Sequence, residues 1–178
     1  MALPNVNITL GNGNIGSVTL SDDGIAGLIV TGTAVSTTLA LEKVYVLSST
    51  ADLKKLGITE ENNPLAYKEI AAFYASAGDG AELHLLVTDE ENTLTDICSS
   101  VDGSPLKKLI DSAAGRIRLV GININPGAEY EGTVTSGIDQ DVVTAVTAAQ
   151  QVVDSYMSQI APFVVLLPAM GWSGSTTS

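Results

Sequence analysis

The sequence predicts an α/β fold in which a mixed, mostly parallel sheet is flanked by helices and preceded by an N-terminal β-ribbon or arm. Short apolar runs recur along the chain, and stretches with helical periodicity lie between them. Such alternation is typical of parallel strands joined by helices that cover both faces of the sheet. We expect an arm or hairpin over residues 1–23, an α/β domain over 24–170, and a polar tail over 171–178 that begins a truncated linker.

The N-terminal region has the pattern of a ribbon. Val6, Ile8 and Leu10 alternate with polar residues, so they share one face of a strand. Asn12 and Gly13 follow, and this pair favours a hairpin turn because both residues tolerate positive φ. A lone hairpin is only marginally stable in water, so we expect the segment to pack on another surface.

Between residues 24 and 88 apolar runs alternate with helical patterns. The runs are short and bounded by glycines, or rich in β-branched residues, which suits buried strands. Asn63 followed by Pro64 is typical of a helix start, because asparagine can cap free N–H groups and proline has none to satisfy. A capping-box pattern at Ser49–Asp52 indicates a shorter helix that ends at Gly57. The expected elements are strands at 25–31, 43–48 and 82–88, the short helix, and a helix at 64–77.

The second half of the body repeats this alternation. Ser104 and Pro105 are typical of another helix start. Glycine, proline and threonine between residues 125 and 139 favour a long loop. The longest helix carries one apolar stripe, at positions 142, 146, 149, 153, 156 and 160. The expected elements are helices at 94–101, from 104 to about 115 and at 141–161, and strands at 116–122 and 163–168.

The charge of the chain disfavours two classes of partner. Its 178 residues include 8 basic and 20 acidic side chains, a net charge of −12. Such a surface repels phosphates, so we expect neither nucleic acid nor an anionic membrane as a partner. The N-terminus lacks the basic and apolar regions of a secretory signal, so we expect the protein in the cytoplasm.

The low content of charged residues points towards contact surfaces. Charged residues make up 16% of the chain, against about 25% in ordinary soluble domains. The mean hydropathy is +0.28, although no stretch is long enough to predict a membrane span. Surfaces that neighbouring molecules cover would explain both values. The alternative is that alanine, valine, glycine, threonine and serine are simply abundant.

The motifs of nucleotide-binding and hydrolytic enzymes are absent or incomplete. Residues 11–16 match G-x-G-x-x-G by letter, but a dinucleotide site needs a helix to begin there and hold a pyrophosphate. A strand-like run follows instead, so a hairpin turn is favoured and no cofactor is expected. The sequence also contains neither a P-loop nor a G-x-S-x-G elbow.

Few side chains could support catalysis or metal binding. The single histidine, His84, and single cysteine, Cys98, exclude a disulfide framework, a multi-cysteine zinc site and any pair of imidazoles. A catalytic pair of His84 and Cys98 is disfavoured because acidic neighbours raise the pKa of a thiol, and a small buried thiol is the alternative. Asp22–Asp23 and Asp89–Glu91 could hold a hard cation but lack EF-hand spacing, which favours solvated loop charge. We expect no catalytic residue and no metal.

Two arginines are candidates for contacts between subunits. Arg116 and Arg118 are expected on one face of the strand at 116–122. In so acidic a chain both should find carboxylate partners. Those carboxylates could belong to the same subunit or to a neighbouring one.

One pattern consists of a strand, an S-x-x-D-L segment with a glycine-ended helix, a helix with an aromatic pair, a glycine-rich turn and an apolar strand. Its residues are Glu42–Gly57 and Pro64–Val87, with Phe73-Tyr74 as the aromatic pair and Gly78–Gly80 as the turn. Together with Leu3–Leu10, Gly24–Val30, Arg116–Gly121 and Phe163–Pro168, this pattern resembles the contractile tail sheath proteins of phages and prophages, most closely tail-sheath-like proteins of the Bacteroidetes type.

The resemblance implies a structural subunit with neither catalysis nor cofactor. Sheath subunits self-assemble as rings around a tail tube, meet baseplate proteins, and contract. It also implies a bacterial cytoplasmic location during assembly and a place in the virion tail afterwards. Arms of such proteins add strands to neighbouring subunits, which makes Val6, Ile8 and Leu10 expected subunit contacts. Arg116 and Arg118 are the other expected contacts, because of the charge argument above. Sheath proteins are longer, and the resemblance implies that this chain corresponds to their N-terminal portion, without their C-terminal domain and arm.

Two other functions remain open from the residues. One is a small α/β enzyme and the other is a module that binds a ligand or a protein. Both would place their site at the carboxyl ends of the strands. A pocket lined by carboxylates with perturbed pKa values would favour the enzyme, and a deep apolar pocket would favour the binding module.

Overall fold

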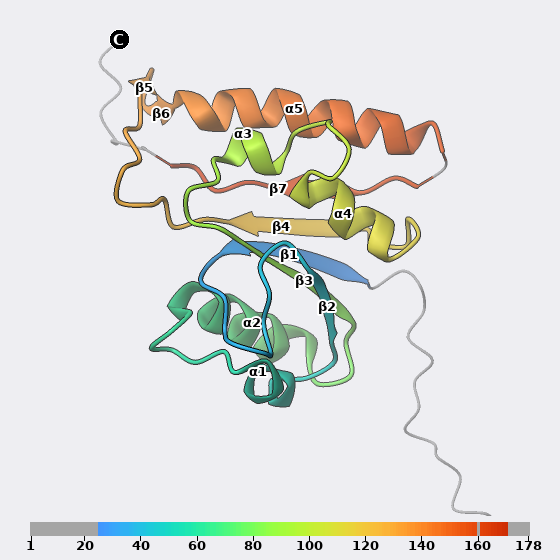
Figure 1. The fold of residues 1–178 in the computed structure, drawn as a ribbon. Coiled ribbons are helices and arrows are strands. Elements are labelled where there is room, and N and C mark those ends of the chain that lie inside the picture. The colour runs from blue at the N-terminus through green and yellow to red at the C-terminus, as the bar shows by residue number, and fades with distance from the viewer. Residues whose placement is uncertain (1–24, 160, 171–178) are drawn as a thin grey trace, which may run out of the picture.

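A five-stranded sheet forms the centre of the protein (Figure 1). The structure is a computed structural model that describes residues 25–159 and 161–170. The strand order is β2-β3-β1-β4-β7, with β2 antiparallel to β3 and the other pairs parallel. This confirms the predicted mixed, mostly parallel sheet. The strands are β1 (Ala26–Thr31), β2 (Val44–Leu47), β3 (Leu83–Thr88), β4 (Leu119–Asn123) and β7 (Val164–Leu166).

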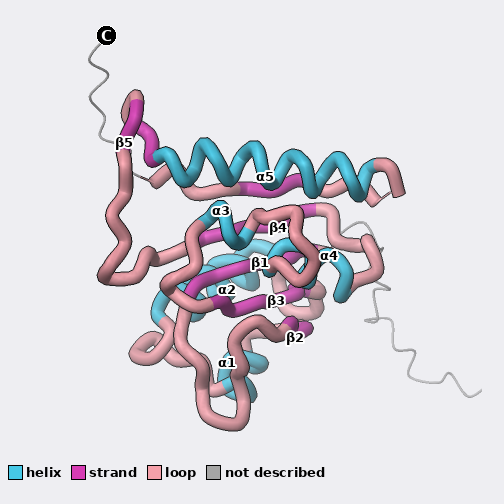
Figure 2. Tube along the Cα trace, turned by 45° about the horizontal axis from the view of Figure 1, so that its top comes forward, coloured by secondary structure: helices cyan, strands magenta, loops and turns pink. Residues whose placement is uncertain are grey.

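Helices cover both faces of the sheet. In Figure 1, α3, α4 and α5 gather at the top and α1 and α2 at the bottom, with the strands between them. Figure 2 shows the same layering after a rotation. The helices are α1 (Ala51–Leu56), α2 (Pro64–Ala77), α3 (Leu94–Ile97), α4 (Pro105–Ser112) and α5 (Gln140–Met157).

The two faces of the sheet bury two separate hydrophobic clusters. On β1, Leu28 and Val30 point into the cluster with α1 and α2, whereas Ile29 points into the cluster with α3, α4 and α5. The alternation follows from the two-residue period of a strand. Gly27 faces α4, and a Cβ there would lie 2.6 Å from Leu109 Cδ2. The missing side chain therefore lets α4 pack closely on the central strand.

The side chains at three predicted helix starts bond differently from the prediction. At one of them, Ser104 makes no side-chain cap for α4 and donates from Oγ to the Ser99 carbonyl at 2.6 Å. Asn63 makes no side-chain cap for α2. Its Oδ1 accepts the backbone N–H of Thr33 at 2.8 Å, and its Nδ2 donates to the Thr33 carbonyl at 3.1 Å. Gly32 makes this possible because a Cβ there would collide with Asn63 Oδ1. The two hydrogen bonds of Asn63 thus hold the loop after β1 against the start of α2.

The predicted capping box at 49–52 forms only in half. Thr50 is the N-cap of α1 and makes no side-chain cap bond, while Asp52 accepts the N–H groups of Ser48 and Ser49. A complete box forms instead at Thr93 and Asp96, at the start of α3.

Several predicted boundaries in the second half are wrong by a few residues. β4 begins at Leu119, so residues 116–118 precede the strand. A short hairpin of β5 (Val134–Thr135) and β6 (Ile138–Asp139) interrupts the predicted loop at 125–139. α3 is a single turn that ends at Ile97.

Within the described residues, none of the helices combines the length and hydropathy that crossing a membrane requires.

The predicted stripe of α5 is rotated on the helix. The buried side chains are Val142, Ala145, Ala149, Val152 and Tyr156. Val146, expected inside, is 53% exposed. The predicted ribbon at 1–23, the tail at 171–178 and position 160 of the stripe lie outside the described residues.

Candidate assembly surface

Part of the sheet has no covering layer on the α2 side. Leu119 pairs with Val164, and Gly121 pairs with Leu166, so these four residues share one face. The register of β4 on β1 places Gly121 beside Leu28, whose side chain packs in the cluster with α2. We call Leu119, Gly121, Val164 and Leu166 the β4–β7 face. It continues the face that α2 covers, beyond the reach of that helix.

The β4–β7 face is aliphatic and open. Leu119, Val164 and Leu166 are 43%, 57% and 54% exposed. Shallow hollows of about 190 and 270 Å³ lie beside them, towards Phe73 and Glu69 of α2. Strands of α/β sheets are normally buried on both faces, so exposed side chains of this kind indicate a surface that another layer can cover.

β7 is also the edge of the sheet. The apolar run at 163–168 was expected to form a core strand. It does form a strand, β7, but this strand lies at the edge of the sheet and not in its core. β7 pairs with β4 on one side only, and no strand of the described residues lies on its other side. An open edge presents unpaired N–H and C=O groups that another chain can bind. The edge and the β4–β7 face together form one candidate assembly surface.

The two predicted contact arginines do not share a strand face. Arg116 donates from Nε to the Ala113 carbonyl at 3.2 Å, and its Nη2 lies 3.7 Å from Glu82 Oε1. Arg118 donates from Nη1 to the Gly115 carbonyl at 2.8 Å and to the Pro162 carbonyl at 3.4 Å. Both precede β4, where the chain turns out of α4. Arg116 thus has a carboxylate partner within the subunit, whereas these contacts of Arg118 are to carbonyl oxygens.

The remaining predicted contacts, Val6, Ile8 and Leu10, lie outside the described residues. The β4–β7 face was missed because its residues form apolar runs like those of core strands. The order of strands in the sheet decides their exposure, and a single sequence carries no direct signal for that order.

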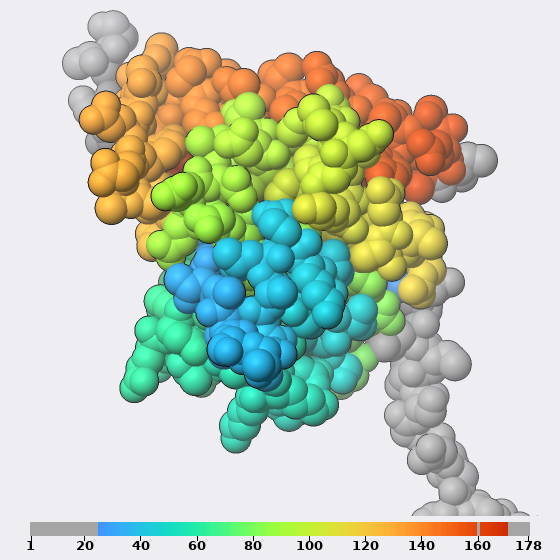
Figure 3. All heavy atoms as spheres, in the orientation of Figure 1, coloured from blue at the N-terminus to red at the C-terminus, as the bar shows by residue number. Residues whose placement is uncertain are grey.

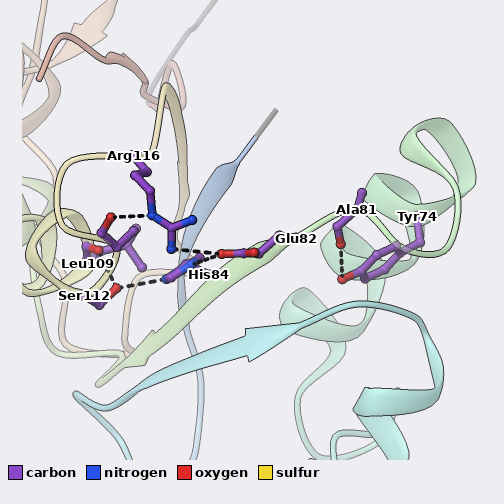
Figure 4. Close-up of polar contacts among 8 residues, drawn as sticks. Tyr74, Ala81, Glu82, His84, Leu109, Ser112 and Arg116 are labelled. Atoms are coloured by element: carbon purple, nitrogen blue, oxygen red, sulfur yellow. Dashed lines mark hydrogen bonds and ion pairs between the residues drawn. The ribbon is translucent and has the colours of Figure 1, made fainter. Parts of the chain in front are cut away.

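His84 lies in a polar cluster at the amino end of β3 (Figure 4). Its Nδ1 is 2.9 Å from Ser112 Oγ and its Nε2 is 2.9 Å from Glu82 Oε1. Ser112 Oγ donates its proton to the Leu109 carbonyl at 2.6 Å. A serine engaged in this way does not offer its proton to the imidazole, so the nucleophile–base bond of acyl transfer is not formed. The cluster instead ties β3 to the end of α4.

Cys98 has no accessible thiolate. It is fully buried in the cluster beneath α3, α4 and α5. Burial, with a smaller effect from Asp141, raises the pKa of its thiol to about 12. His84 is bonded to Ser112 and Glu82 instead, so the structure does not bring the only imidazole and the only thiol together.

An acidic hollow lies at the carboxyl ends of the strands. It measures about 720 Å³ and is lined by the segments after β3 and β4, with the carboxylates of Asp89, Glu90, Glu91, Glu129 and Glu131. These charges repel the phosphates and carboxylates that many α/β sites bind.

Among the described residues, no group of three or more His, Cys, Asp or Glu side chains is placed to hold a metal ion. Asp22–Asp23 lies outside them.

Comparisons with known proteins give one family and one distant structure. The family described as DUF2586, N-terminal domain, matches residues 3–177. No curated protein matches the chain. Among solved structures, the chain is similar to the helical sheath of the anti-feeding prophage (AFP) in its contracted state, at 17% sequence identity and a TM-score of 0.45. The match covers 98% of this chain and 43% of that chain, so this chain spans less than half of its length.

Proposed function

The chain belongs to the DUF2586 family, and from this premise we propose that it is a structural subunit of a contractile tail sheath, of phage or prophage origin. In this role it self-assembles with other sheath subunits around a tail tube, meets baseplate proteins and carries out no catalysis. It assembles in the bacterial cytoplasm and then belongs to the virion tail. The sequence resemblance to sheath proteins of the Bacteroidetes type supports the proposal.

The observation that carries the proposal is the uncovered β4–β7 face. Burying a large aliphatic side chain contributes about 1.5–3 kcal/mol. Leu119, Val164 and Leu166 are each about half exposed, so part of this free energy remains for a contact with a neighbour. A chain whose charged residues make up only 16% of its length also has fewer charges to desolvate on assembly.

The test compares two exposed aliphatic residues in the full-length protein. Leu166→Asp places a charge on the β4–β7 face, and Val101→Asp places one on the loop between α3 and α4, where Val101 is 69% exposed. We expect wild type and Val101→Asp to form sheath-like polymers in electron micrographs and to pellet on centrifugation. Leu166→Asp should remain unassembled while its circular dichroism stays native. Polymers of Leu166→Asp as abundant as those of Val101→Asp would refute the role of this face.

The N-terminal segment is proposed as a second contact. The alternation of Val6, Ile8 and Leu10 suits a strand that adds to the sheet of a neighbour. Deleting residues 1–20 should leave the melting temperature of the body almost unchanged and abolish polymers. A deletion that unfolds the body would instead make the segment part of the core.

A further inference from the structure

The long helix α5 carries two apolar stripes. One is buried on the sheet, at positions 142, 145, 149, 152 and 156. The second lies next to it and is defined by Val143, Val146, Gln150, Val153 and Met157, which we call the outer stripe. Its residues repeat at spacings of three and four, which is the heptad pattern of a helix that packs against another helix.

The outer stripe is exposed except at Val153, which is partly buried against the core cluster. Val143, Val146 and Met157 are 47%, 53% and 56% exposed. Val146, Gln150 and Val153 also line one wall of a groove of about 460 Å³, whose other wall is β7 and the chain after it. Helix surfaces flanked by a groove of this kind can accept a second helix. In Figure 3, the orange atoms of α5 run along the upper border of the molecule.

The charge of α5 is as unusual as its apolar surface. A surface helix normally carries charged residues opposite its buried face. The only ionisable residues of α5 that carry charge at neutral pH are Asp141 and Asp154. Asp141 accepts the backbone N–H groups of Leu94 and Thr95 at the start of α3, which leaves Asp154 as the outward charge. Because the chain has 20 acidic and 8 basic residues, two copies repel over most surfaces and can approach over this one.

We propose that α5 pairs with α5 of a second copy, antiparallel, about a two-fold axis near Gln150. Apart from Tyr67 on α2, the exposed large apolar side chains of the described helices all lie on α5, so α5 is itself the best complement in a second copy. The outer stripe extends seven residues to either side of Gln150. An antiparallel pair therefore brings Val143 near the partner's Met157 and Val146 near the partner's Val153.

The polar residue at the centre fixes the alignment. A single polar side chain in a heptad seam selects one register, because other registers leave it facing apolar groups. Gln150 donates from Nε2 to Asp154 Oδ1 at 2.7 Å in the single subunit, and its amide stays on the exposed side of the helix. The contact is isologous and centred on α5, which packs on the sheet face opposite the β4–β7 face, although the groove beside it is walled by β7 and includes Val164.

Cysteine cross-linking tests the pair directly. Gln150→Cys places a thiol at the two-fold axis, within the Cα separation of about 4–7 Å that a disulfide requires. Gln151→Cys is the matched control, since it is exposed but lies off the outer stripe. Cys98 is buried and contributes no background. Under mild oxidation we expect covalent dimers of Gln150→Cys at least ten-fold faster than of Gln151→Cys, and equal rates would overturn the proposal.

Sedimentation of the Leu166→Asp protein, which should not polymerise, gives a second measurement. We expect it to form a dimer with a Kd between about 5 and 500 µM, the range of a small interface. Adding Val146→Glu should weaken this dimer at least ten-fold in Kd, and adding Thr147→Glu, one residue off the stripe, should leave the Kd unchanged. A Leu166→Asp monomer throughout this range, or an open-ended series of its oligomers, would overturn the two-fold pair. Loss of polymers by Leu166→Asp with cross-linking preserved would show that the two contacts are separate.

Discussion

Asp52 offers the sharpest test of the electrostatics, because its carboxylate closes the turn between β2 and α1. Its Oδ2 accepts the backbone N–H groups of Ser48 at 2.8 Å and Ser49 at 3.1 Å, and Lys55 Nζ donates to Oδ1 at 2.6 Å. The hydrogen bond from Lys55, followed by that from the Ser48 backbone, lowers the pKa of Asp52 from 3.8 to about 2. We predict that Asp52→Asn destabilises the fold in a pH-dependent way.

The size of the effect follows from the pKa shift. A lowering of this size corresponds to about 2.5 kcal/mol of stability when the carboxylate is ionised. The side chain of Lys55 is 76% exposed, so solvent screening reduces its contribution and we expect about 1–1.5 kcal/mol. The carboxylate binds protons more weakly when folded than when unfolded. Its contribution is therefore complete above about pH 4 and is lost as the pH falls through about 2.

Urea unfolding followed by circular dichroism measures the effect. The free energies of unfolding of wild type and Asp52→Asn should differ by about 1–1.5 kcal/mol at pH 6, and the difference should shrink between pH 4 and 2. Asp102→Asn is the control, because Asp102 also bonds to a lysine, Lys107, but its side chain is 97% exposed. It should behave as wild type at every pH. A constant difference across the pH range, or an equal effect of Asp102→Asn, would refute the reasoning.

Two further predictions concern the core. Gly27→Ala should lower the free energy of unfolding by about 1–3 kcal/mol, because its Cβ would lie 2.6 Å from Leu109 Cδ2. Gly121→Ala, whose Cβ would meet Leu28 at an ordinary 3.7 Å, should change it by less than about 1 kcal/mol, and equal values from urea titrations would count against the close packing of α4. Burial raises the pKa of the Cys98 thiol to about 12. At pH 8 this thiol should therefore resist a thiol reagent in the native protein and react with it in denaturant. A rapid reaction of the native protein would contradict the burial of Cys98.

The sequence was informative where local chemistry decides the structure. The run at 25–31 became β1 and the Pro64 pattern became α2, because apolar runs and first-turn prolines act through their own neighbours. The side chain of Asn63 was expected to cap a helix but bonds to the loop after β1. That outcome depends on Gly32, which is remote in the chain, so no local pattern could reveal it.

The candidate site was harder to predict than the fold. Val164 and Leu166 have the sequence of a buried strand, and only the strand order places them at an edge. Arg118 was expected to bond to a carboxylate, but it donates to the carbonyl oxygens of Gly115, in the turn after α4, and of Pro162, between α5 and β7. On α5, two adjacent apolar stripes cannot be separated by periodicity alone, so Val146 was assigned to the core although it faces outward.

The order of the strands also matters while the protein is being made. β1 is the first strand of the described chain to leave the ribosome, yet its two neighbours in the sheet are β3 and β4. Ala26 cannot meet Leu119 until nearly 100 more residues have been translated, which takes roughly 5 to 20 s. For that time the apolar strand has an incomplete sheet around it. Chaperone binding during synthesis therefore matters most for nascent chains that have not yet reached residue 119.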